Sequence, residues 1–145
     1  MNTPSANQAQ NVEVRLRTLR IMWLALFLSV GLYYVFTLFA ERSPDLKPNH
    51  TMSLATIGVG VSMVLGSFLV KSKLLARATN EQQLQLVQPA YVLALAMCEV
   101  PALLGMLVFF TTANRNYYVL MIIAAIGQLL HFPRREHLEN AAYKR

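Results

Sequence analysis

Residues 21–40 read IMWLALFLSVGLYYVFTLFA, a run of 20 residues without a charged side chain. At 1.5 Å per residue, a helix of this length crosses the hydrocarbon core of a bilayer, which is about 30 Å thick. The run is too long for the apolar core of an ordinary signal peptide, and residues 38–40 (LFA) do not form a small-residue cleavage site. It therefore predicts a transmembrane helix that the chain retains.

Three further apolar runs follow, at about residues 52–70, 88–111 and 117–132. Of the 145 residues, 55% are hydrophobic and only 14% are charged, whereas about a quarter of the residues in a soluble domain are charged. We therefore expect an all-α membrane protein with four transmembrane helices within residues 13–133. A polar, disordered N-terminus (1–12) should precede this domain, and a basic cytoplasmic tail (134–145) should follow it.

The basic residues predict the orientation, because positive charges gather in cytoplasmic segments. With four spans, 10 of the 13 basic residues fall on one side: Arg15, Arg17, Arg20, Lys71, Lys73, Arg77, Arg134, Arg135, Lys144 and Arg145. Both termini should therefore be cytoplasmic, in what we expect to be a bacterial inner membrane. The net charge of +6 is better explained by topology and lipid headgroups than by nucleic acid, so the expected partner is the bilayer.

Glu99 is the acidic residue that interrupts this pattern, since it lies in the middle of the third run. A charged carboxylate at that depth costs about 2.5 kcal/mol or more, so an intramembrane carboxyl is by default a candidate functional group. Desolvation favours its uncharged form, and we expect it to bind and release a proton. Pro101 lacks an N–H, which leaves the carbonyl of Met97 without its helical partner and predicts a kink beside the carboxyl.

The second run carries small residues at a spacing of four, at Gly58, Ser62 and Gly66, with Gly60 between them. Small residues on one face allow a second helix to approach closely. We expect this face to form a helix contact. Taken alone, the pattern is more typical of a generic packing seam between membrane helices.

The region from about residue 54 to 108 resembles subunit c, the proteolipid of rotary ATP synthases. The similar segments are LATIGVG (54–60), ARA (76–78), LALAMCE (93–99) and LGMLV (104–108). The resemblance implies a helical hairpin formed by the second and third spans, with Arg77 in its cytoplasmic loop and Glu99 as the proton-binding carboxylate. It also implies a homo-oligomer or a partner in a membrane complex.

The departures from that family bear on the ion and on packing. Residues 63–65 (MVL) are bulky where the family is usually small, and the first and fourth spans have no counterpart in the two-span subunit. Rings that bind sodium add a glutamine on the first helix and a hydroxyl after the carboxylate. Residues 52–70 contain no glutamine, and Val100 follows Glu99, so a proton is the expected ion.

Three functions are consistent with the sequence. The first is a c-like proton-translocating subunit, the second a small proton-coupled transporter, and the third a noncatalytic accessory or scaffold protein. The sequence contains no phosphate-binding glycine loop, zinc-ligand spacing or Ser/His/Asp set. We therefore expect no cofactor, no metal and no catalytic site of its own; at most the chain would be a subunit of a proton-translocating ATP synthase.

Overall fold

The computed structural model describes residues 6–42 and 45–142, and every regular element in this part of the chain is helical. The elements are α1 (Ala6–Phe39), α2 (His50–Asn80), the short 3₁₀ helix η1 (Leu84–Leu86), α3 (Val87–Thr111), α4 (Tyr117–Leu130) and α5 (Arg135–Ala142). The predicted all-α class is confirmed.

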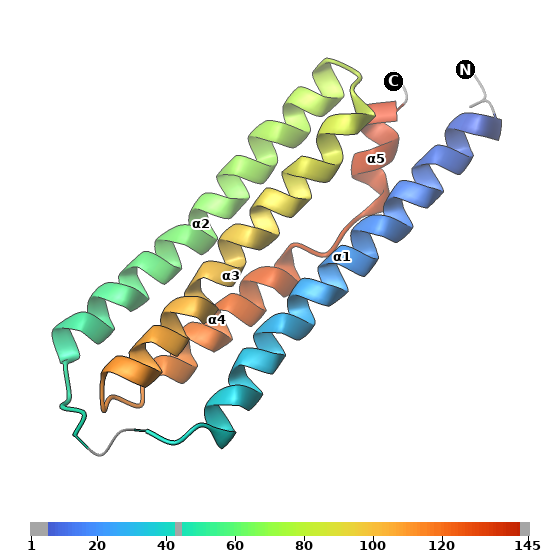
Figure 1. The fold of residues 1–145 in the computed structure, drawn as a ribbon. Coiled ribbons are helices and arrows are strands. Elements are labelled where there is room, and N and C mark those ends of the chain that lie inside the picture. Colours follow the sequence, from blue (N-terminus) through green and yellow to red (C-terminus); the bar gives the residue numbers. More distant parts are fainter. Residues whose placement is uncertain (1–5, 43–44, 143–145) are drawn as a thin grey trace.

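The helices form a bundle in which α3 and α4 lie between α1 and α2 (Figure 1). The most extensive contact in the described chain is between α2 and α3, whereas α1 and α2 do not pack against each other. The buried side of α3 is rich in small residues, including Ala90, Ala94, Ala102 and Gly105. Small side chains let neighbouring helices approach closely, so α3 is the central element of the bundle.

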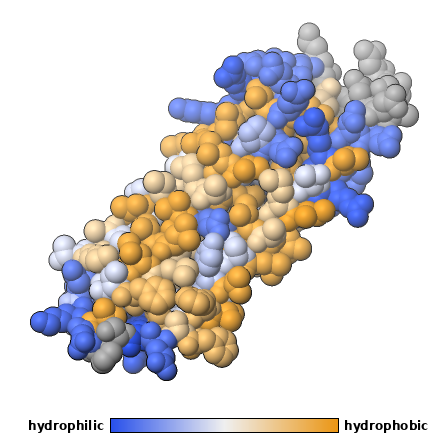
Figure 2. Space-filling view, in the orientation of Figure 1, coloured by the Kyte–Doolittle hydropathy of each residue, from blue (hydrophilic) through white to orange (hydrophobic). Residues whose placement is uncertain are grey.

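Three helical segments are long and apolar enough to cross a membrane: Gln10–Phe39, His50–Asn80 and Leu84–Thr111. Helix α4 has only 14 residues, or about 21 Å at 1.5 Å per residue. It forms a fourth candidate span only together with α5, which meets it at an angle of 47°. Apolar side chains cover most of the middle of the bundle, and hydrophilic ones gather at its two ends (Figure 2).

The predicted disorder at the N-terminus is wrong for residues 6–12, because α1 begins at Ala6; residues 1–5 lie outside the described part. Val12, Leu16 and Leu19 are buried in one cluster with Leu138 of α5. Their spacing of four and three residues places them on one helix face, and this packing stabilises the first turns of α1. The predicted basic tail thus includes a packed helix, while Lys144 and Arg145 lie outside the described residues.

Helix α2 extends ten residues beyond the predicted end of the second span, to Asn80. Arg77 therefore lies in the last turn of α2 rather than in a loop, which corrects the sequence prediction. Its Nε is 2.7 Å from Glu81 Oε1, a one-turn pair of the kind that stabilises helices modestly. The chain then reverses through Gln82, whose φ is +54°.

The predicted contact face on α2 is only partly correct within a single chain, because Gly60 and Gly66 meet neighbouring helices whereas Gly58 and Ser62 do not. Gly58 and Ser62 are exposed, and a Cβ atom added at Gly58 would meet nothing within 4 Å. The buried residues of α2 are instead Ser53, Gly60, Ser67 and Ala78. Two of these intervals are seven residues, or nearly two turns, so they form a stripe that the four-residue spacing does not identify.

Gly60 is the glycine of α2 that the packing requires to be small. A Cβ atom added there would lie 2.8 Å from Leu120 Cδ2 of α4 and 3.2 Å from Pro101 Cβ of α3. At Gly66, the nearest atom would be Met97 Cε, at 3.2 Å. Gly60 therefore marks the point where three helices meet.

Candidate functional site

Glu99 lies at the midpoint of α3, twelve residues from either end. Its side chain is half-buried and contacts α1 rather than α2. The preceding residue, Cys98, is buried and contacts Ser67 of α2. Successive residues on a helix point about 100° apart, which explains why these two neighbours serve different interfaces.

Two hydroxyl groups of α1 hold the carboxyl group. Ser29 Oγ lies 2.7 Å from Glu99 Oε1, and the hydroxyl of Tyr33 donates to the same oxygen across 2.9 Å. Ser29 and Tyr33 are four residues apart, so both lie on the face of α1 that contacts α3. The site is therefore built by α1 and α3 together.

This arrangement accommodates both protonation states of the carboxyl. Ser29 has one hydroxyl hydrogen but two acceptors within reach, because its Oγ also lies 2.7 Å from the carbonyl oxygen of Leu26. When Glu99 is ionised, Ser29 and Tyr33 both donate to it. When Glu99 is protonated, it donates to Ser29 Oγ, and Ser29 donates to Leu26 instead. Rotation of one hydroxyl group thus preserves the hydrogen bonds in either state.

No positive side chain neutralises Glu99 in the described part of the chain. The two ion pairs there, Arg77–Glu81 and Arg135–Glu139, are exposed, and each joins two residues that are four apart in the chain. Residues 6–42 and 45–142 also contain no cluster of three or more His, Cys, Asp or Glu side chains that would hold a metal ion. The carboxyl therefore has only hydroxyl partners, which is an arrangement suited to a proton.

A second polar cluster lies on the side of α3 that faces α2, and no pattern in the sequence predicted it. Ser67 Oγ is 3.3 Å from Cys98 Sγ and 3.2 Å from His131 Nε2. The other ring nitrogen of His131 donates to the carbonyl oxygen of Gly127 across 2.9 Å. All three side chains are fully buried, so they connect α2, α3 and the end of α4 in the interior.

A third polar group lies where α5 packs against the bundle. The hydroxyl of Tyr91 is 2.5 Å from His137 Nδ1 and accepts a hydrogen bond from the backbone N–H of Arg134 at 3.1 Å. The ammonium of Lys71 lies 4.2 Å from the centre of the Tyr91 ring, within the range of a cation–π contact. These contacts fasten α5 to α2 and α3.

Several other residues stand out in the sequence, and only two of them lie together in the structure. Pro101 is buried against Gly60, and α3 continues through Pro101 as one helix. The kink predicted there stays a prediction. Gly58, Ser62 and Arg77 are exposed, and none of them forms a hydrogen bond with Glu99 in the described structure.

Comparisons with protein-family models, with curated proteins and with solved structures found no match to this chain. The chemistry of the site therefore carries the functional argument.

Proposed function

We propose that this chain is a membrane subunit that binds and releases protons at Glu99, in the manner of the subunit c proteolipid that its central region resembles. The observation that carries the proposal is the pair of hydroxyl groups from Ser29 and Tyr33 on Glu99 Oε1. A charged carboxyl at bilayer depth is energetically costly, and a residue of this kind is therefore by default a candidate functional group. Here its partners support both the charged and the uncharged form.

The proposed site differs from a two-helix proteolipid in one respect. Ser29 and Tyr33 come from α1, outside the region of resemblance at residues 54–108. Helices α2 and α3 would form the c-like hairpin, while α1 would supply the groups that set the stability of the proton on Glu99. Movement of α1 relative to α3 would then change the hydrogen bonds of the carboxyl and with them its readiness to give up the proton.

In this proposal the chain crosses a bacterial inner membrane four times, with both termini in the cytoplasm, and acts within a homo-oligomer or a larger membrane complex. Gly58 and Ser62 are exposed on α2, so the face predicted to pack would meet a second copy or a partner subunit. Helix α4 would complete the fourth crossing despite its 14 residues, because a bilayer can thin locally around a short apolar helix.

A small proton-coupled transporter is the second candidate, and one observation favours it. Tyr33, which binds Glu99, also lines an apolar cavity of about 420 Å³ between α1 and α3, together with Leu32, Phe36 and Met106. A hydrophobic substrate in this cavity would contact Tyr33, whose hydroxyl group is hydrogen-bonded to Glu99. In that case proton binding at Glu99 would depend on the substrate.

Proton flux into reconstituted vesicles tests the proposal. The protein is purified with the partners that copurify from its native membrane, and acidification is followed with an internal pH-sensitive dye under an imposed potential. Glu99→Gln is expected to abolish flux, because the amide keeps hydrogen-bonding capacity but cannot release a proton. Glu13→Gln makes the same chemical change at an exposed carboxyl and should leave flux unchanged.

Equal flux from the parent and Glu99→Gln would show that Glu99 is structural and would favour the accessory or scaffold function. Flux that appears only when a hydrophobic cation is added, and that Glu99→Gln removes, would favour the transporter.

A further inference from the structure

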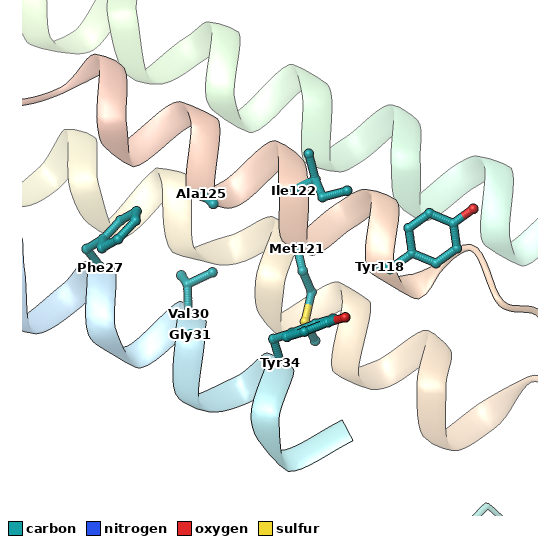
Figure 3. A pocket seen from close by; sticks show the side chains of 8 residues that line it. All are labelled: Phe27, Val30, Gly31, Tyr34, Tyr118, Met121, Ile122 and Ala125. Carbon is teal, nitrogen blue, oxygen red and sulfur yellow. The ribbon is translucent and has the colours of Figure 1, made fainter. Parts of the chain in front are cut away.

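Two adjoining cavities lie along α1 and α4, away from Glu99. The first, which we call the lateral groove, has a volume of about 350 Å³ and is lined by apolar side chains such as Phe27, Val30, Met121 and Ile122. In Figure 3 the α1 residues form one wall and the α4 residues the other, with Ala125 at one end and Tyr118 at the other.

The second cavity, which we call the arginine pocket, has a volume of about 460 Å³ and lies at the end of the bundle where α1 ends and α3 turns into α4. Arg42, Arg115, Thr37 and Tyr117 are among its lining residues. Tyr118 lines both cavities. The groove and the pocket therefore adjoin at this residue.

The arginine pocket has an unbalanced positive charge. Within the described residues, neither Arg42 nor Arg115 takes part in an ion pair, and no acidic residue is among those that line the pocket. Glu41, the chain neighbour of Arg42, is exposed instead. Arg42 is half-buried and Arg115 is exposed, and a bound anion would interact favourably with both positive charges.

The position of Arg42 leaves its hydrogen-bond donors free. Its guanidinium carbon lies 4.5 Å from the centre of the Phe109 ring and 4.8 Å from that of Tyr117. These two rings lie edge to face at 74°, and within the described residues the guanidinium of Arg42 takes part in no ion pair, so its fork of N–H groups remains available to an anion. Such a fork matches the oxygen atoms of a phosphate group.

The depth of the groove fits one leaflet of a bilayer. From Phe27 to Thr37 the groove and pocket follow α1 for ten residues, which is about 15 Å at 1.5 Å per residue. Half of a hydrocarbon core of about 30 Å has the same depth. Ser29, beside the inner end of the groove, contacts the midpoint of α3, which places that end near the bilayer centre.

We propose that the groove and the pocket form a binding site for an anionic phospholipid. Its phosphate would lie between Arg42 and Arg115, and one acyl chain would extend along α1 and α4 toward Phe27. An acyl chain can fill an apolar groove without any positive charge nearby. The two arginines at the end of this groove therefore distinguish it from a general lipid contact.

Binding of added lipid to the delipidated full chain in a mild detergent tests this inference, with native mass spectrometry as the readout. The probes are phosphatidylglycerol, phosphatidylcholine, diacylglycerol and inorganic phosphate. Phosphatidylglycerol is expected to bind at least about tenfold more tightly than the other three, a difference of at least roughly 1.4 kcal/mol. Comparable binding of diacylglycerol would reduce the site to an apolar groove, and comparable binding of phosphate would reduce it to a small-anion pocket; either result overturns the proposal.

Two variants locate the site. Arg42→Gln/Arg115→Gln should lose this preference, whereas Arg17→Gln/Lys73→Gln, which removes the same charge from exposed positions, should keep it. Gly31→Leu should weaken phosphatidylglycerol binding by filling the groove without a clash, because a Cβ atom at Gly31 meets nothing within 4 Å. Full phosphatidylglycerol binding by both the double arginine variant and Gly31→Leu would contradict the proposed location.

Discussion

Modification by a hydrophobic carbodiimide is expected to fall on Glu99 and to spare the other six acidic residues of the chain. Such reagents enter the lipid phase and react with protonated carboxyl groups. Glu99 lies at the midpoint of α3 without a positive partner in the described structure. The other carboxyl groups lie outside the four apolar runs. Peptide mass spectrometry of protein labelled in vesicles measures the outcome.

Two variants serve as controls for this labelling, one at the carboxyl and one at a hydroxyl group of α1 that binds it. Glu99→Gln should remove the modification completely, whereas Tyr33→Phe should retain it, since the carboxyl is still present. Label spread over several acidic residues, or an equal yield from the parent and Glu99→Gln, would be inconsistent with a protonated carboxyl in the membrane.

The largest loss of stability is expected from Gly60→Leu. A Cβ atom at this position would lie 3.2 Å from Cβ of the rigid Pro101 ring and 2.8 Å from Leu120 Cδ2, the movable end of a side chain. The bulk of a leucine would have to displace Leu120 and widen the contact between α2 and α3. Overpacking of a dense core typically costs about 1–3 kcal/mol, and more when several elements must shift. We expect the free energy of unfolding to fall by at least about 2 kcal/mol.

Gly58→Leu is the matched control, because it makes the same substitution in the same helix at a position with nothing within 4 Å. For the detergent-solubilised single chain, in which this face has no partner, its free energy of unfolding should not fall, and loss of a mid-helix glycine should raise it by roughly 0.5–1 kcal/mol. Thermal unfolding in detergent, followed by the fluorescence of Trp23, compares the two variants. A similar loss in both would mean that Gly60 is not at the helix crossing.

The sequence predicted the helical class and the apolar segments well, because run length and missing charge are direct consequences of the bilayer. It failed where packing between helices decides the outcome. The four-residue spacing was misleading at Gly58 and Ser62, which are exposed, since the contact stripe of α2 runs through Ser53, Gly60 and Ser67. The small residues of α3 at positions 90, 94, 98, 102 and 105 were an available signal for the true seam.

The site was predicted in part. Glu99 stood out from its apolar surroundings, but its partners lie 66 and 70 residues away in the chain, and no local pattern links them. Ser29 and Tyr33 were visible as polar residues four apart within the first apolar run. Their shared helix face indicated a partner, while its identity depended on which helix packs beside α1. The Ser67–Cys98–His131 cluster was missed for the same reason.

Infrared difference spectroscopy of the protein in lipid membranes, recorded as the pH is raised from neutral, tests most directly whether Glu99 binds a proton reversibly. The carbonyl stretch of a protonated carboxyl should be present at neutral pH, disappear at high pH and return when the pH is lowered. The band should be absent from Glu99→Gln and shifted in Tyr33→Phe, which loses one hydrogen bond to the carboxyl. A spectrum without this band at neutral pH, or with the same band in Glu99→Gln, would contradict a proton held at Glu99.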